Sequence, residues 1–185
     1  KAIADVEDGG TITLAADYVV TTENRIPSGG SWYEGLFYQG DKSFTLDLGG
    51  YKFTNESGAV NDYMMLFNNS GEKASVITIT NGTIDAGTAA YCAVCTATSS
   101  TQKITLNLEN VELINNNPGG AVIKVRGVAE GTELNVKAGT KITAKDSYVG
   151  IEAVSKKTVV NIYDGAEINQ QGTSNYVGSL VGVSF

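Results

Sequence analysis

The sequence predicts an all-β fold, a right-handed parallel β-helix in which one chain winds through about six coils of three strands each. Three observations predict it. A short alternation of apolar and polar residues recurs along the chain, Gly, Asn or Asp follows each copy, and the composition combines 22 Gly with only 2 Pro. Alternation with a period of two is typical of half-buried strands, and such units repeated at a steady interval indicate a solenoid.

The alternation defines the first strand of each coil. It occupies residues 10–14, 44–48, 75–79, 104–108, 132–136 and 158–162. Because side chains on a strand point alternately to opposite faces, the apolar positions are expected to face the core and the polar position between them to face outward. That outward column contains Thr13, Asp47, Thr78, Asn107, Asn135 and Asn161. Its Asn side chains are expected to hydrogen-bond one another as a ladder; the alternative is that they bind a glycan.

Each first strand is followed by a corner and two further strands. The corners hold Gly49-Gly50, Asn81-Gly82, Asn110, Gly139 and Asp164-Gly165, residue types that tolerate positive φ. The second strands are anchored by Phe53, Ile84, Leu113, Ile142 and Ile168, and the third strands are expected at 32–38, 63–67, 91–95, 121–125, 148–153 and 176–181. There is no hexapeptide rhythm, which argues against a left-handed β-helix, and the intervening segments are too short for helices.

The two ends of the chain complete the domain prediction. Ala2, Ile3 and Val6 lie on one helical face, so residues 1–7 are expected to form a short helix that caps the first coil. Residues 180–185 carry no polar cap, so three explanations stay open: a loop folds over this end, another chain covers it, or the chain is excised from a longer protein, which we prefer. The whole chain, 1–185, is interpreted as one β-helix domain.

Composition limits the partners. The net charge is −7 and the sequence contains no cluster of Lys and Arg, so a nucleic-acid partner is not expected. No apolar run approaches the roughly 20 residues that span a membrane. No cofactor or metal site is expected, and the oligomeric state is not specified.

The two cysteines, Cys92 and Cys95, have the spacing of redox and metal motifs but lie in a strand pattern. Residues three apart on a strand face opposite sides, which argues against a disulfide. We expect Cys92 in the core and Cys95 half-exposed.

Several segments resemble the pectate-lyase-like β-helix superfamily, in particular the secreted or surface β-helix proteins of bacteria. They are AI at 2–3, DGGTITL at 8–14, FTLDLGGY at 44–51 and ITITNGTI at 77–84. The superfamily includes polysaccharide lyases, glycoside hydrolases, phage tailspikes and adhesins. The resemblance therefore implies the fold and an extracellular or cell-surface location, and it does not specify an activity.

The candidate ligand-binding residues are aromatic side chains near the start of the third strands: Trp32, Tyr33, Tyr63, Tyr91, Tyr148 and Tyr176. An outward row of rings, one per coil, could stack on sugars or dock a host or cell-surface protein. The alternative is that each ring only shields the core at the start of its strand.

Two functions follow from these features. The preferred one is a non-catalytic module that acts as a scaffold, an adhesin or a glycan-binding segment, with the row of tyrosines as the candidate glycan site. The alternative is a polysaccharide lyase or glycoside hydrolase, but His is absent, the outward polar column holds one acid, Asp47, and no catalytic residues are assigned. Carboxylates in adjacent coils near Arg126 or a lysine would favour the enzyme, whereas a face of tyrosines would favour binding.

Overall fold

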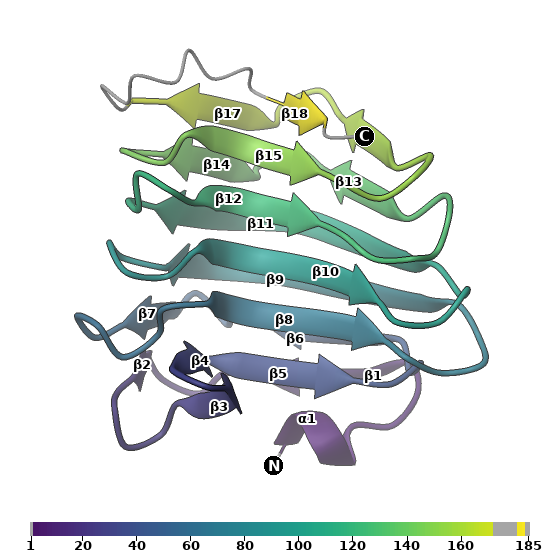
Figure 1. Ribbon diagram of the computed structural model, residues 1–185, viewed down its shortest axis with the longest axis horizontal. Helices are drawn as coiled ribbons and strands as arrows, with labels where there is room; N and C mark the ends of the chain where they lie inside the picture. The colour runs from purple at the N-terminus through teal and green to yellow at the C-terminus, as the bar shows by residue number, and fades with distance from the viewer. Residues whose placement is uncertain (1, 172–180, 184–185) are drawn as a thin grey trace.

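The computed structural model describes residues 2–171 and 181–183. It is 53% strand and 2% helix, and its strands form a parallel β-solenoid of about five turns, which confirms the predicted fold with a minor difference in the number of coils. The turns stack from the N-terminal helix at one end to the C-terminal strands at the other (Figure 1). In the described residues, no helix is long and apolar enough to cross a membrane.

The larger sheet has ten strands and contains the first and second strands of each turn. Its main path is β1 (Gly10–Thr13), β6 (Phe44–Asp47), β9 (Ser75–Asp85), β11 (Ile104–Asn115), β13 (Glu133–Val136) and β16 (Val159–Ile162). Beside it lie β2 (Tyr18–Val20), β7 (Lys52–Asn55), β14 (Lys141–Ala144) and β17 (Glu167–Gln170). In β9 and β11 the two strands are continuous through Asn81 and Asn110, which turn the chain with φ of 57° and 50°. These two turns therefore have two strands, not the predicted three.

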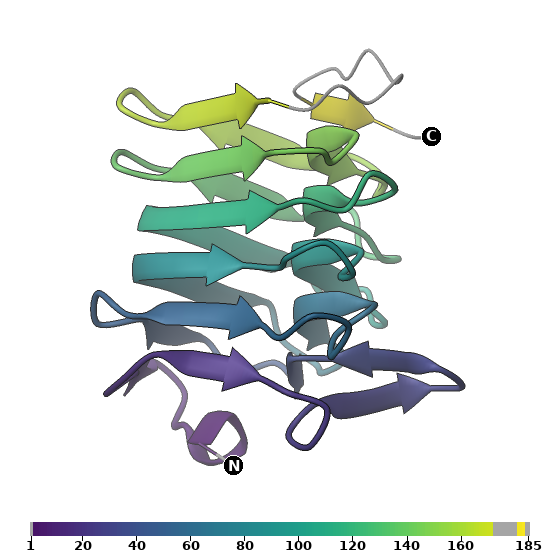
Figure 2. The same ribbon diagram turned by 90° about the vertical axis from the view of Figure 1, so that its left-hand side faces the viewer.

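The smaller sheet contains the third strand of each turn. It comprises β5 (Leu36–Gln39), β8 (Tyr63–Asn69), β10 (Cys92–Thr98), β12 (Ala121–Val125), β15 (Val149–Ala153) and β18 (Val181–Val183), all parallel. This sheet faces the viewer in Figure 1, and Figure 2 shows the stack from the side.

One step of the predicted alignment is wrong by two residues. Leu46 of β6 pairs with Ile79 of β9, not with Ile77, and Asp47 consequently lies opposite Thr80. Because side chains alternate with a period of two, a shift of two keeps the apolar residues in the core. The sequence pattern could not distinguish the two registers, since both bury the same side chains.

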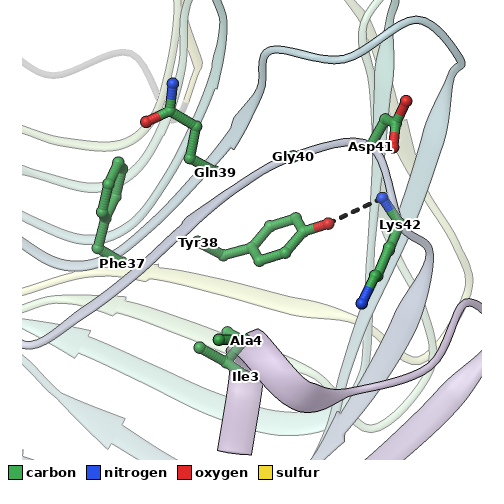
Figure 3. Close-up of a pocket in the computed structure, with 8 residues that line it drawn as sticks. All are labelled: Ile3, Ala4, Phe37, Tyr38, Gln39, Gly40, Asp41 and Lys42. Atoms are coloured by element: carbon green, nitrogen blue, oxygen red, sulfur yellow. Dashed lines mark hydrogen bonds between the residues drawn. The ribbon is translucent and has the colours of Figure 1, made fainter. Parts of the chain in front are cut away.

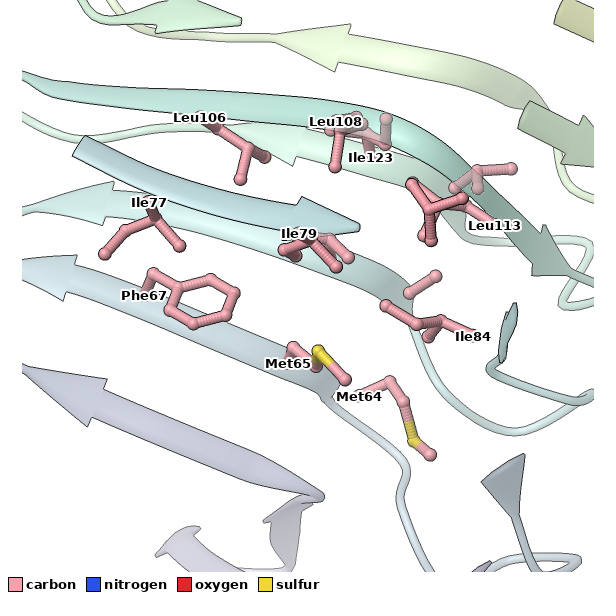
Figure 4. Packing of buried hydrophobic residues seen from close by; sticks show 14 of the residues in the cluster. Met64, Met65, Phe67, Ile77, Ile79, Ile84, Leu106, Leu108, Leu113 and Ile123 are labelled. Atoms are coloured by element: carbon pink, nitrogen blue, oxygen red, sulfur yellow. The ribbon is translucent and has the colours of Figure 1, made fainter. Parts of the chain in front are cut away.

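The core lies between the two sheets. The inward columns contribute Ile77, Ile79, Leu106 and Leu108, all fully buried, and Figure 4 shows them facing Phe67 from the smaller sheet. The second-strand anchors Phe53, Ile84, Leu113 and Ile142 are also buried, as predicted. Each such side chain contributes about 1.5–3 kcal/mol of transfer free energy on burial, and no turn could bury its own apolar face without its neighbours.

The first turn departs from the repeat. The helix α1 (Ala2–Asp5) has four residues, fewer than predicted, and Val6 just after it is buried against the core. The expected third strand at 32–38 is divided at Gly35 into β4 (Trp32–Glu34) and β5. Strand β4 instead pairs antiparallel with β3 (Ile26–Gly29). A Cβ atom at Gly35 would lie 2.6 Å from the Met64 carbonyl oxygen, which explains why a glycine stands there.

Candidate functional site

The outward face of the larger sheet carries the predicted Asn ladder. The amide of Asn161 donates to Asn135 Oδ1 at 2.9 Å, Asn135 donates to Asn107 Oδ1 at 2.9 Å, and Asn107 donates to Thr78 Oγ1 at 3.3 Å. A parallel contact joins the corner residues, where Asn110 donates to Asn81 Oδ1 at 3.0 Å. These side-chain amides hydrogen-bond one another from turn to turn, so the ladder stabilises the stacking of the turns.

The aromatic residues on the smaller sheet do not form one row. Tyr63 pairs in register with Cys92, whereas Tyr91 lies one residue before that position and its amide donates to the Asp62 carbonyl. Tyr148 shares the earlier position with Tyr91, since each lies one residue before its strand. The assumption that Tyr63 and Tyr91 occupy equivalent positions is therefore wrong, because the aligned residue types do not follow the hydrogen-bonded register.

The structure also separates the other candidates. Trp32 is 56% exposed. Tyr33 occupies the opposite face of β4 from Trp32, because side chains alternate along a strand, and the Arg25 guanidinium lies 3.4 Å from its ring centroid. Tyr148 is half-buried. Tyr176 lies outside the described residues.

Beneath Tyr63 lies a small apolar cluster that is separate from the main core. It contains Cys92 and Cys95, both fully buried and free of any disulfide, with Tyr91 packed beside them. The expectation that Cys95 is half-exposed is wrong. Ala93 and Val94 both pack into the main core, so the alternation is interrupted and the two cysteines contact one cluster. Burial raises the pKa of both thiols, which keeps them protonated and unreactive.

Charged side chains hold the tyrosine hydroxyls. Arg126 donates to the Tyr63 hydroxyl. Lys124 donates to the Tyr91 hydroxyl at 3.3 Å and forms an ion pair with Glu152 at 2.9 Å, with both charged side chains less than one fifth exposed. The rings of Tyr63 and Tyr91 meet edge to face with their centroids 6.3 Å apart. The two rings are therefore fixed on a rigid sheet.

Two carboxyl groups that the sequence analysis missed lie beside these rings. Glu34 is only 3% exposed, and burial, reinforced by the charge of Asp62 and opposed by Arg126, raises its pKa to about 7. The pKa of Asp62 is also raised by burial, and Ser28 donates to this carboxylate at 3.3 Å. Glu34 was missed because β4 lies outside the repeat, whereas Asp62 could have been found from its position directly before Tyr63.

A shallow pocket of about 330 Å³ unites these groups. It is lined by Trp32, Asp62, Tyr63, Tyr91 and Lys124, which come from four successive turns. The pocket combines three aromatic rings with one acidic and one basic side chain. Such a combination offers apolar faces to a ligand and polar groups that orient it.

A second pocket, of about 280 Å³, lies between α1 and the segment that follows β5 (Figure 3). Tyr38 crosses it, and its hydroxyl accepts a hydrogen bond from the Lys42 amide at 2.8 Å. This hydroxyl is already engaged by the protein's own backbone. We therefore place the candidate site at the Trp32 pocket.

Within the described residues, no group of three or more Cys, Asp or Glu side chains could hold a metal ion. Comparisons of the chain with protein-family models, with curated proteins and with solved structures give no significant match.

Proposed function

We propose that this chain is a non-catalytic, glycan-binding module, and that the Trp32 pocket is its sugar-binding site. The observation that carries the proposal is the exposed indole of Trp32 beside two immobilised tyrosine rings. Aromatic rings present large apolar faces at a low cost in conformational entropy, and sugar rings carry apolar C–H faces that can pack on them.

The polar groups of the pocket support the same function. Asp62 can accept hydrogen bonds from sugar hydroxyls and Lys124 can donate them. Both residues, like the tyrosines, are positioned by neighbouring parallel strands, so little order has to be imposed when a ligand binds.

The proposal extends to the setting of the protein. We place the chain in the pectate-lyase-like superfamily on the sequence resemblance, as a scaffold or adhesin segment of a secreted or surface-attached bacterial protein. Its partner would then be an extracellular or host glycan. A cell-surface protein that docks on the same aromatic residues is the competing partner.

A glycan array that compares the native chain with Trp32→Ala tests the proposal. Trp32 is exposed, so its removal should leave the fold intact, whereas Tyr63 is buried over the cysteine cluster and its truncation would perturb the sheet. Tyr163→Ala is the matched control, because Tyr163 is 50% exposed and follows β16, on the other sheet. We expect Trp32→Ala to bind the glycan at least about tenfold more weakly than the native chain does. Tyr163→Ala should bind it with the native affinity. Native protein that binds no glycan, or binding that survives in Trp32→Ala, would refute the proposal.

A second candidate function, glycosidic bond cleavage, is favoured by one observation. Glu34 and Asp62 lie in adjacent turns near Arg126, and Glu34 has a pKa of about 7, suited to a general acid. Release of new reducing ends from a bound oligosaccharide, abolished in Glu34→Gln, would support cleavage. Binding without release would leave the non-catalytic function in place.

A further inference from the structure

The carboxyl of Glu34 makes no hydrogen bond or ion pair in the described part of the chain, although the residue as a whole is only 3% exposed. Its oxygens are not fully enclosed, because they are absent from the buried polar atoms that lack a partner. A carboxylate with so little water around it and no protein donor is costly to ionise, and a bound cation would lower that cost. A structural role is a poor explanation, since a glutamine or an apolar residue would fill the same space at lower cost.

Glu34 lies on the side of the candidate pocket. Trp32 and Glu34 are two residues apart on β4, so both side chains point to the same face of that strand. Trp32 lines the pocket with Asp62 and Tyr63, and the Gly35 amide that follows Glu34 donates to the Tyr63 carbonyl. Glu34 does not itself line the pocket, but it lies close enough to Asp62, which does, for the two charges to interact, so a cation bound at Asp62 is within range of Glu34.

The charges around the pocket do not balance. Lys124 is matched by Glu152 in an ion pair, which leaves Arg126 facing both Glu34 and Asp62. The remaining titratable neighbours are neutral, since the tyrosine hydroxyls and the thiols all have pKa values raised by burial; they are Tyr63, Tyr148, Cys92 and Cys95. When Glu34 and Asp62 are both ionised, the pocket carries one negative charge in excess.

We propose that the pocket selects amino sugars, with the protonated amine held by Glu34 and Asp62 and the sugar ring packed on Trp32. This inference rests on the proposed glycan-binding function and names its ligand class. The aromatic walls favour the same ligand, because the faces of Trp and Tyr rings attract cations. A neutral N-acetylated sugar has the same ring but offers no positive charge to the carboxylates.

Binding of an amine is coupled to a proton. Below about pH 7 the folded protein holds Glu34 largely protonated. A bound ammonium group stabilises the ionised carboxylate, so Glu34 releases its proton when the ligand enters. Binding of an N-acetylated sugar leaves this equilibrium unchanged.

Isothermal titration calorimetry at about pH 6 tests the proposal with the glucosamine tetrasaccharide and its fully N-acetylated form. Titrations in buffers of different ionisation enthalpy count the protons released. We expect the free-amine tetrasaccharide to bind the native chain at least about tenfold more tightly and to release a proton. Glu34→Gln should abolish both the preference and the release without weakening the N-acetylated ligand. Glu109→Gln, the same charge change on the exposed outer side of β11, should retain the preference.

Each outcome is decisive. Equal affinities, or a preference that persists in Glu34→Gln, would overturn the amine assignment. If the N-acetylated ligand alone binds through Trp32, the amine assignment fails while the glycan-binding function stands. If neither ligand binds, the amine assignment is overturned, and the glycan array decides the broader function separately.

Discussion

The two outward faces of the solenoid use their polar side chains in opposite ways. On the larger sheet, Asn161, Asn135 and Asn107 donate to the residue below each of them, so the ladder satisfies its own hydrogen bonds. Beside the smaller sheet, no hydrogen bond or ion pair in the described residues engages Glu34 of the β3–β4 hairpin, and Asp62, just before β8, lines a pocket. A repeated, self-satisfied array stabilises the stack, whereas an irregular array with unpaired charges is suited to a ligand.

The same contrast appears in the ion pairs. Lys124 and Glu152 join β12 to β15 at 2.9 Å and are 14% and 16% exposed, whereas Lys137 and Glu109 lie 3.7 Å apart and are 40% and 51% exposed. Partly buried charges depend on each other because water cannot replace the missing partner. The smaller sheet should therefore respond more strongly to charge removal.

The largest expected effect is that of Lys124→Met, which leaves the Glu152 carboxylate without its counter-ion and the Tyr91 hydroxyl without its donor. We expect the free energy of unfolding to fall by about 3 kcal/mol, measured by urea denaturation. Glu152→Met in the same chain should restore most of the loss. A double variant no more stable than Lys124→Met would contradict this account of the pair.

Glu34→Gln should change how stability depends on pH. The folded protein raises the pKa of Glu34 from 4.5 to about 7, so the proton binds more tightly to the folded state. The stability that the folded state gains from holding this proton is fully present below about pH 4.5 and is lost as the pH rises through about 7. Relative to the native chain, Glu34→Gln should thus gain about 3 kcal/mol of unfolding free energy between those limits, measured by denaturation at each pH. Parallel pH profiles for the two proteins would show that Glu34 titrates normally.

Asn135→Ala interrupts the ladder at its centre. Asn135 donates to Asn107 and accepts from Asn161, so its loss leaves the Asn107 amide oxygen without this donor and the Asn161 amide with only its longer contact to Glu133, at 3.4 Å. We expect a cost of about 1–2 kcal/mol in unfolding free energy, with unchanged glycan binding. A loss of binding in this variant would mean that the ladder face belongs to the site.

The smallest effect is expected for Lys137→Met, which breaks the exposed pair with Glu109. The free energy of unfolding should change by less than about 0.5 kcal/mol. Together with Lys124→Met, this variant compares the removal of the same charge from each face. A similar loss of unfolding free energy in both variants would mean that the two faces do not differ in their dependence on ion pairs.

The regular parts of the fold follow from the sequence because each turn repeats one pattern. The inward columns, the corners at Asn81 and Asn110 and the Asn ladder are all readable from the alternation and the turn residues. The two-residue shift between β6 and β9 is not readable, since it buries the same residues.

The candidate site was only partly predictable, because it forms where the repeat is broken. Trp32, Tyr63 and Tyr91 were identified as aromatic residues, and all three line the pocket. Glu34 was missed because it lies beside the pocket on the antiparallel hairpin of β3 and β4. No alternation pattern relates a residue in that hairpin to the parallel strands beside it.

The most direct test of the central claim uses Trp32, which is the only tryptophan in the chain. Its fluorescence reports on the pocket alone, because no other indole contributes. Titration with an oligosaccharide that binds on the array should shift the emission to shorter wavelength, and the shift should reach half of its maximum at the dissociation constant found by calorimetry. Saturable glycan binding with unchanged Trp32 emission would contradict the account, because it would place the sugar elsewhere on the solenoid.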